Sequence, residues 1–362
     1  MKKFAFIIHP LQLNDVTRKF SWAEKIPDTV VKSVVRIMPA VKASHITGIK
    51  SLTGKKIEGY FVGCTLTSQQ MLDLPTDKVI KKIIKAGKKA EELGADIVGL
   101  GAFTSVVGDK GITIAKELNI PVTTGNSYTV ATAIEGTKLA AKKMNHQLSK
   151  STAAIVGATG SIGRAVSLIL SDDLQKMYLV ARNKKRLEKL KDQINMINTE
   201  IEIIHTTNID NAIRESNIIV SASGAVESLI NPDSLQPGAV VCDVARPRDV
   251  AVKVGHSRDD VLVIEGGIVK VPGDVNFNLN FGYPPGTAYA CMAETMMLTL
   301  ENRKEDYSLG PIIEIEKVKE TVIMAKKHGF KLSGLRSFER ALSEDKIREI
   351  KNNAAKRKVA MC

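Results

Sequence analysis

Three glycines stand between an apolar run and a helix-like segment near the middle of the chain. Ala153–Val156 has the composition of a buried strand, and the glycines follow it at G-x-x-G-x-x-G spacing. The first permits a tight turn, the middle of the turn lets backbone N–H groups approach a pyrophosphate, and the last allows close helix–strand packing. The pattern indicates a dinucleotide-binding turn made of Gly157, Ala158, Thr159, Gly160, Ser161, Ile162 and Gly163.

The residue that would read the ribose comes after a second apolar run, Met177–Val180, about twenty residues further on. An acidic residue there would accept a hydrogen bond from the 2′-hydroxyl of NAD. Arg182 instead offers a cation to a 2′-phosphate, so we expect NADPH, unless this arginine caps a helix or is simply exposed. After the apolar run Ile218–Val220, we expect backbone contact with the cofactor from Ser221, Ala222 and Ser223.

A cysteine near the start of an apolar helix-like stretch is the candidate nucleophile. With Thr287 as the predicted N-cap, the sulfur of Cys291 would lie about one turn into the helix. Partial positive charge at a helix N-terminus lowers a thiol pKa, and the thiolate is the reactive form. Apolar neighbours such as Met292 and Met296 suit a buried structural cysteine equally well, so both interpretations stay open on the residues alone.

Several elements must position these residues, because 362 residues exceed a typical single core. From Ser151 onward, continuous apolar runs alternate with helix-like segments, as in a doubly wound parallel sheet. Residues 1–148 also alternate strand-like and helix-like runs, with a hairpin predicted at Ser51–Lys56. We therefore expect an α/β fold: a substrate-side α/β domain over 1–148, a Rossmann domain over 149–285, and C-terminal helices over 286–362 that carry Cys291 and end in a basic tail.

Composition excludes several classes of protein. With 44% hydrophobic and 25% charged residues and no long uncharged apolar run, we expect a cytoplasmic globular protein. The four cysteines are widely spaced, which predicts neither a disulfide framework nor a metal site. The net charge of +13 has two explanations. Either the lysines simply lie on solvated helix faces, or they bind an acidic partner such as anionic lipid, coenzyme A or an acidic carrier protein. We expect no nucleic-acid partner; peripheral membrane association and oligomeric state stay open.

Five blocks of sequence resemble the long-chain acyl-[acyl-carrier-protein] reductases of cyanobacterial alkane biosynthesis, which form fatty aldehydes. The blocks occur in the family's order and span most of the chain. They are Gly99–Ser105, Thr123–Asn126, Val156–Gly163, Glu265–Gly267 and Ala290–Glu294. The chain departs from this family at Tyr128, where we expect a histidine, and in a basic extension after Leu332 that has no clear counterpart.

The resemblance implies NADPH-dependent reduction of a long-chain fatty acyl thioester, carried by acyl carrier protein or coenzyme A, to an aldehyde. The family's reaction proceeds through a covalent acyl-cysteine intermediate, and the resemblance implies that Cys291 is the cysteine that carries the acyl group. Its N-terminal domain helps to house the acyl chain, which gives a substrate-side role to Phe103, Thr104, Ser105, Thr124, Gly125 and Asn126.

Two rival interpretations remain. An NADP-dependent dehydrogenase of a small hydroxy acid, similar to shikimate dehydrogenase, would show the same glycine turn and arginine and would need no cysteine. A non-enzymatic NADP(H)-binding protein would keep the turn for binding alone. No general acid can be chosen from residue type, and the candidates are His9, His45, Tyr128 and Tyr289.

Overall fold

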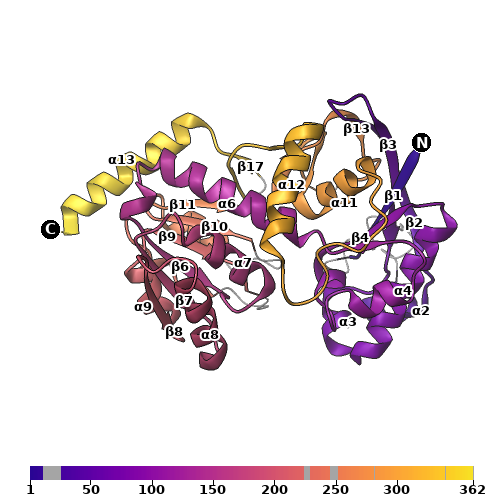
Figure 1. The fold of residues 1–362 in the computed structure, drawn as a ribbon, viewed down its shortest axis with the longest axis horizontal. Helices are drawn as coiled ribbons and strands as arrows, with labels where there is room; N and C mark the ends of the chain where they lie inside the picture. The colour runs from indigo at the N-terminus through magenta and orange to yellow at the C-terminus, as the bar shows by residue number, and fades with distance from the viewer. Residues whose placement is uncertain (11–25, 224–228, 245–251, 281, 339, 362) are drawn as a thin grey trace. The chain divides into compact units, whose positions relative to one another are not determined.

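The computed structural model describes residues 1–10, 26–223, 229–244, 252–280, 282–338 and 340–361 (Figure 1). The chain forms two compact units. Unit 1 comprises Met1–Asn126, Lys270–Pro311 and Glu320–Lys331. Unit 2 comprises Ser127–Val269, Ile312–Lys319 and Leu332–Cys362.

A six-stranded mixed sheet forms the centre of unit 1, in the order β13-β2-β3-β1-β4-β5. β2 pairs antiparallel with β3 and β13, while β3, β1, β4 and β5 run parallel. The predicted hairpin at residues 51–56 joins β2 to β3 and is confirmed. The strands are β1 (Lys2–Ile8), β2 (Val41–Lys50), β3 (Lys56–Gly63), β4 (Ile97–Leu100), β5 (Val122–Thr123) and β13 (Gly273–Asn276).

Apolar side chains cover both faces of this sheet. Ala5 and Ile7 of β1 join the core under α4, which contributes Val79 and Ile83. Phe6 lies on the other face, edge-on to Phe61 at 6.4 Å between ring centroids. The helices of unit 1 are α2 (Asp28–Ile37), α3 (Ser68–Asp73), α4 (Thr76–Glu92), the 3-10 turn η2 (Ala102–Ser105), α5 (Ile112–Lys116) and α11 (Ala290–Leu300).

The unit boundaries differ from the predicted segments 1–148, 149–285 and 286–362. Residues 127–148 belong to unit 2. Residues 270–311 belong to unit 1, because β13 adds to the edge of its sheet beside β2 and α11 packs on that sheet. The C-terminal part is not one helical segment either. It contains α12 (Ile315–His328), β16 (Arg336–Ser337), β17 (Arg340–Ala341) and α13 (Glu344–Met361), and the predicted basic tail is part of α13. Three further short strands are β12 (Ile268–Lys270), β14 (Thr287–Tyr289) and β15 (Lys331–Leu332).

Unit 2 is built on a parallel sheet in the order β11-β10-β9-β6-β7-β8. The chain starts in the middle at β6, winds outward to β8, and then returns to β9 on the other side of β6. This is a doubly wound sheet whose switch point lies between β6 and β9. The predicted α/β Rossmann fold is confirmed. Its strands are β6 (Thr152–Val156), β7 (Lys176–Val180), β8 (Glu202–Thr206), β9 (Ile218–Ser221), β10 (Val240–Asp243) and β11 (Leu262–Glu265).

Helices and short 3-10 turns precede β6 or connect the strands of unit 2. They are α6 (Asn126–Lys143), η3 (Leu148–Lys150), α7 (Ser161–Leu170), α8 (Lys184–Asn195), α9 (Ile209–Arg214), η4 (Pro232–Ser234) and α10 (Val252–Ser257). A fully buried ion pair, Arg258 Nε to Asp260 Oδ1 at 2.7 Å, braces the turn before β11. Among the described residues, no helix combines the length and hydropathy needed to cross a membrane.

A buried histidine at the end of α12 forms a hydrogen bond with the β2–β3 hairpin of unit 1. His328 is fully buried at the end of α12, with Nε2 2.6 Å from Glu301 Oε1 and Nδ1 2.8 Å from Ser51 Oγ. The carboxylate accepts the Nε2 proton, so Nδ1 accepts from the serine hydroxyl. Burial lowers the pKa of His328 from its usual 6.5, and this effect outweighs the opposing influence of Glu301.

We predict that this histidine makes the stability of the chain sensitive to acid. Its folded pKa is depressed, so its contribution to stability is present above pH 6.5 and is lost as the pH falls through the folded pKa. His146, whose pKa burial also lowers, adds a slope of the same sign. His328→Gln should flatten the fall in unfolding free energy between pH 7.5 and 5, measured by urea denaturation. His205→Gln is the matched control, and an equal slope in wild type and His328→Gln would contradict the prediction.

Candidate functional site

The glycine turn of unit 2 has the backbone geometry that a bound pyrophosphate requires. Gly157 has φ +79°, and a Cβ there would stand 2.8 Å from the carbonyl oxygen of Ala222. A Cβ on Gly163 would stand 2.3 Å from the oxygen of Gly157, so the start of α7 can approach the turn only without a side chain. Gly160 is the N-cap of α7, which places the first N–H groups of the helix at the turn. These residues fit the phosphates of a dinucleotide.

The predicted neighbours of the turn follow the ends of β7 and β9. Ser221 ends β9 beside β6, and the N–H of Ala222 donates to Val156 O at 2.9 Å. Arg182 follows the end of β7 and is exposed. The cap of α8 is Asn183, which accepts a hydrogen bond from Arg186 N at 3.0 Å, so Arg182 is not the cap. The helix-cap alternative is therefore excluded, while the exposed alternative is not, and contact between Arg182 and a 2′-phosphate stays a prediction.

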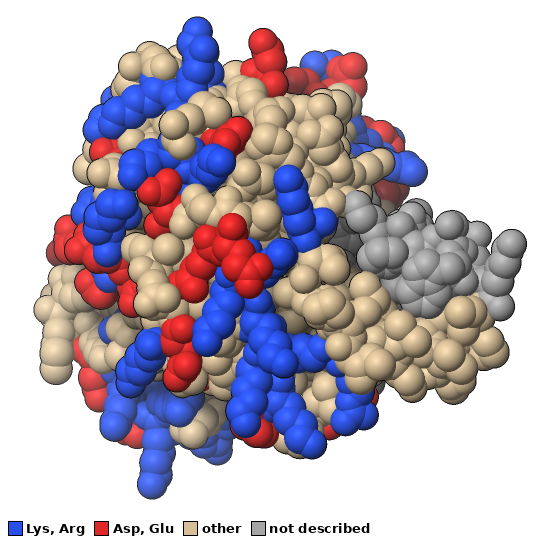
Figure 2. Space-filling model, turned by 90° about the vertical axis from the view of Figure 1, so that its right-hand side faces the viewer, with Lys and Arg blue, Asp and Glu red and all other residues tan. Residues whose placement is uncertain are grey.

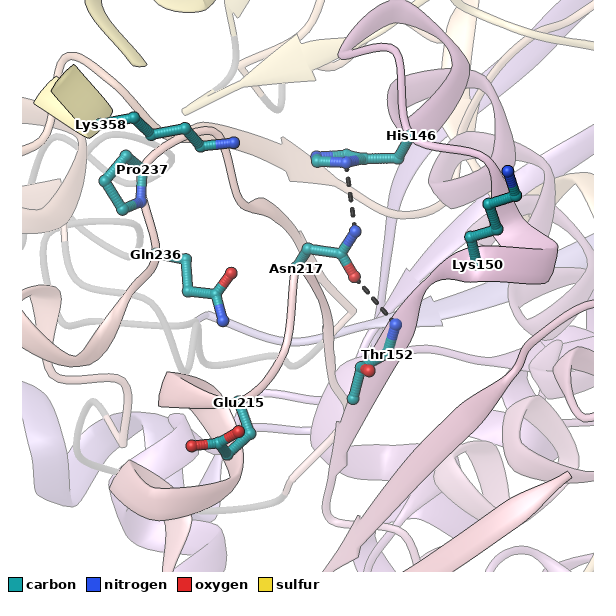
Figure 3. A pocket seen from close by; sticks show the side chains of 8 residues that line it. All are labelled: His146, Lys150, Thr152, Glu215, Asn217, Gln236, Pro237 and Lys358. Carbon is teal, nitrogen blue, oxygen red and sulfur yellow. Dashed lines mark hydrogen bonds between the residues drawn. The ribbon is translucent and has the colours of Figure 1, made fainter. Parts of the chain in front are cut away.

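An open hollow of about 230 Å³ lies at the amino-terminal ends of β6, β9 and β10 (Figure 3). The glycine turn is at the opposite, carboxyl edge of this sheet, so the hollow is separate from the cofactor residues. Its inner polar groups bind one another: Asn217 accepts from Thr152 N at 3.0 Å and donates to His146 Nδ1 at 3.1 Å, and His146 Nε2 donates to Gly238 O at 2.8 Å. We therefore assign the hollow no ligand.

The candidate nucleophile belongs to unit 1. Cys291 is the second residue of α11, whose N-cap is Tyr289. The predicted cap, Thr287, is wrong: it lies in β14, and its hydroxyl donates to Pro284 O. The helix therefore begins later than expected and brings the thiol nearer to its first N–H groups. Cys64 and Cys242 are at most 1% exposed, whereas Cys291 is only partly buried.

Gly125 packs directly against this cysteine. Gly125 has φ +73°, and a Cβ there would stand 2.2 Å from Cα and 2.3 Å from Cβ of Cys291. Its N–H donates to Thr123 Oγ1 at 3.1 Å. The segment after β5 therefore touches the backbone of Cys291 directly, and this contact leaves no room for a side chain. The structure thus brings one predicted substrate-side segment to the predicted nucleophile.

A buried carboxylate fixes this contact. Glu294, one turn after Cys291 and fully buried, accepts hydrogen bonds from Thr123 Oγ1 at 2.6 Å and Ser308 Oγ at 2.8 Å. Thr124 donates in turn to the carbonyl of Ser308. Neither Glu294 nor Ser308 is among the predicted site residues. Glu294 could have been identified from the sequence, because it is a carboxylate in a helix otherwise made of apolar residues and threonine. No feature of the neighbouring sequence identifies Ser308.

The other predicted substrate-side residues are largely buried. Phe103 is 7% exposed and meets His9 edge-on at 6.1 Å between ring centroids. The hydroxyls of Thr104 and Ser105 bind carbonyls of their own turn, at Gly101 and Ala102. Asn126 begins α6 and is 7% exposed. Their contact with substrate stays a prediction.

The four candidate general acids lie on different elements of the structure. His9 Nε2 accepts from Phe103 N at 3.2 Å, and His45 Nε2 lies 3.1 Å from Glu58 on the hairpin. Tyr128 lies in unit 2, where burial raises its pKa above the usual value. Tyr289 is nearest to Cys291 in sequence, and its ring meets Tyr283 at 5.2 Å. As the N-cap of α11, Tyr289 stands at the start of the helix that carries Cys291.

Gly125→Ala should destabilise unit 1 through a clash with Cys291. The control is Gly54→Ala, because Gly54 has φ +82° and nothing within 4 Å of its Cβ position. Both variants bear the cost of a left-handed alanine, and only Gly125→Ala overpacks the helix, which costs about 1–3 kcal/mol. Denaturation curves should show that excess. Equal losses in the two variants would refute the contact.

Arg182→Ala should weaken NADPH binding roughly tenfold or more and leave NADH binding almost unchanged, because only NADPH offers a phosphate to the guanidinium. Dissociation constants from fluorescence titration measure this. Lys189→Ala, an exposed cation on α8, is the control for loss of a positive charge. A parallel loss for both cofactors would show that Arg182 does not read the ribose.

The chain is similar to several known proteins. Residues 138–265 match the family model for shikimate / quinate 5-dehydrogenase. The chain is 30% identical over 362 residues to the aminotransferase PigE of Serratia, covering 96% of this chain and 42% of PigE. It is 27% identical over 334 residues to the long-chain acyl-[acyl-carrier-protein] reductase of Synechococcus elongatus, covering 88% of this chain and 94% of that one.

A solved structure of quinate dehydrogenase from Corynebacterium glutamicum in complex with NAD superposes at TM-score 0.39 and 11% identity, covering 89% of this chain and 98% of that one. The chain spans less than half the length of PigE. The glycine turn and strand order of unit 2, together with the match over residues 138–265, are those of an NAD(P)-binding domain of the Rossmann type.

Proposed function

We propose that the chain uses NADPH to reduce a long-chain acyl thioester to a fatty aldehyde through an acyl group on Cys291. The observation that carries the proposal is the placement of Cys291. It is a partly exposed thiol in the first turn of a buried helix, held against the backbone of Gly125. The relative from Synechococcus, aligned over 94% of its length, bears the name of this reaction.

The first step is transfer of the acyl group to the protein. The Cys291 thiolate attacks the thioester carbonyl, a new C–S bond forms, and the carrier thiolate leaves and takes up a proton. The first N–H groups of α11 favour the thiolate through the helix dipole and can stabilise the oxyanion. Covalent catalysis divides a difficult reduction into two easier steps.

The second step is reduction of the bound acyl group. NADPH, when bound at the glycine turn and Arg182, supplies the hydride for the carbonyl of the Cys291 thioester. The resulting hemithioacetal collapses, the C–S bond breaks, and the aldehyde leaves while Cys291 returns to the thiolate. Glu294 acts as a positioning residue here, since it holds α11 to β5 and keeps Cys291 on Gly125.

We predict that Cys291 becomes acylated without NADPH. Incubation with palmitoyl-CoA should raise the intact mass of the protein by one acyl group, and peptide mapping should place that group on Cys291. Cys291→Ala should give neither the adduct nor, with NADPH, the aldehyde. Cys242→Ala, which removes a buried thiol from unit 2, should keep both. Full turnover by Cys291→Ala would rule out the acyl-enzyme.

One alternative has its own support. The family match over residues 138–265 favours an NADP-dependent dehydrogenase of a small hydroxy acid, similar to shikimate dehydrogenase. Such an enzyme would reduce NADP⁺ with shikimate or quinate and would tolerate Cys291→Ala. A protein that only binds NADP(H) would show neither this activity nor the acyl adduct. The two assays together separate the three functions.

A further inference from the structure

Four exposed lysines form a stripe along α4 in unit 1. They are Lys78, Lys81, Lys85 and Lys88, which we call the lysine stripe. Their spacing of three, four and three residues puts them on one face of the helix. The stripe extends about 15 Å at 1.5 Å per residue. Figure 2 views the molecule from the side on which Figure 1 draws α2, α3 and α4, and lysine and arginine side chains gather on its lower part.

The charges of the stripe are unneutralised. Within the described parts of the chain, none of its four side chains makes an ion pair or a hydrogen bond. The acidic residues of α4 lie beyond the ends of the stripe, at Asp77 and at Glu91–Glu92. Two of these carboxylates have partners outside the stripe. Glu92 forms an ion pair with Lys89 at 2.9 Å, and Glu91 accepts a hydrogen bond from the backbone N–H of Asn119. Asp77 is exposed and lies four residues before Lys81, so the four lysines of the stripe face one nearby carboxylate and the stripe keeps a net positive charge.

The helix beneath the stripe is firmly held. Val79, Ile83, Ala86 and Ala90 on its opposite face are fully buried. Lys82, beside the stripe, donates to Met38 O at 2.8 Å and ties α4 to the end of α2. The lysines thus stand on a rigid scaffold, so a partner that binds them has no helix to order first.

One end of the stripe lies at the edge of the sheet where the substrate-side segments stand. α4 runs antiparallel to its neighbouring strands β3 and β4, so its first turn is at their carboxyl edge. A Cβ on Gly108 would stand 2.7 Å from Ile80 and 3.5 Å from Thr76, so the loop after Phe103–Ser105 packs on that first turn. Gly125 follows β5 at the same edge.

We infer that the lysine stripe is the docking surface for an acidic carrier protein that delivers the acyl thioester. This inference rests on the proposed function. The thioester arm would enter at the carboxyl edge beside Lys78, while acidic side chains of the carrier meet the rest of the stripe. Charge pairs of this kind mainly raise the association rate and select the partner.

The length of the stripe favours a protein over coenzyme A as the source of the thioester. The phosphates of coenzyme A belong to one nucleotide and could engage only neighbouring lysines. A row of four single charges over about 15 Å matches acidic residues spaced along a partner's surface. Duplex nucleic acid and anionic membranes also attract lysines, so both enter the test as competitors.

The test reverses all four charges, with Lys78→Glu, Lys81→Glu, Lys85→Glu and Lys88→Glu in one variant. The matched control reverses four lysines of unit 2, Lys142, Lys189, Lys351 and Lys356, and so removes the same net charge. Five quantities are measured for each full-length protein. They are kcat/KM with palmitoyl-carrier protein, kcat/KM with palmitoyl-CoA, and Kd for holo carrier protein without an acyl group, for duplex DNA and for vesicles with anionic lipid. Circular dichroism verifies folding.

The stripe variant should lose at least tenfold in kcat/KM with the carrier substrate, mostly through KM, and in carrier affinity, yet stay within twofold on palmitoyl-CoA. The control should retain both. Unchanged carrier affinity would overturn the inference, as would a loss confined to duplex DNA or to vesicles with anionic lipid. If wild type reduced neither thioester while carrier binding still depended on the stripe, the proposed reaction would fail and the docking surface would stand.

Discussion

One buried carboxylate governs the arrangement around the thiol. Burying a polar group is costly unless hydrogen-bond partners replace the water, and Glu294 receives hydrogen bonds from the hydroxyls of Thr123 and Ser308. These donors come from β5 and from the segment after α11, so a single side chain links parts of the chain that are distant in sequence. The contact of Gly125 with Cys291, and hence the position of the thiol, depends on this link.

Both units use glycine for close approach, but for different partners. In unit 2, Gly157 and Gly163 let a helix start reach a turn and leave N–H groups for an anion. In unit 1, a Cβ on Gly99 would stand 2.2 Å from Thr295 Oγ1, so α11 can lie directly on β4. In both units the missing side chain of glycine allows close approach. In unit 2 it leaves backbone donors for the anionic cofactor, and in unit 1 it allows close packing beneath the helix that carries the thiol.

Local patterns predicted the parts of the structure that are local. The glycine turn, the strands of the doubly wound sheet and the hairpin at residues 51–56 each depend on neighbours in sequence, and each was correctly placed. Long-range pairing was not predicted. Nothing in residues 270–276 shows that β13 would join β2, and the cap at Thr287 failed because β14 occupies that position. Periodicity cannot reveal that Ser308 and Thr123 would share Glu294, because that contact exists only after both segments have folded.

The interrupted path of unit 1 affects the order in which the chain can fold during synthesis. Most of unit 2 is one continuous stretch, Ser127–Val269, and can collapse once it has left the ribosome. Unit 1 must wait for β13 and α11, since Phe6 and Gly99 on its sheet lack their cover until residue 300 has been made. Its first 126 residues therefore expose an apolar sheet face throughout the synthesis of unit 2, and chaperone demand should concentrate on that interval.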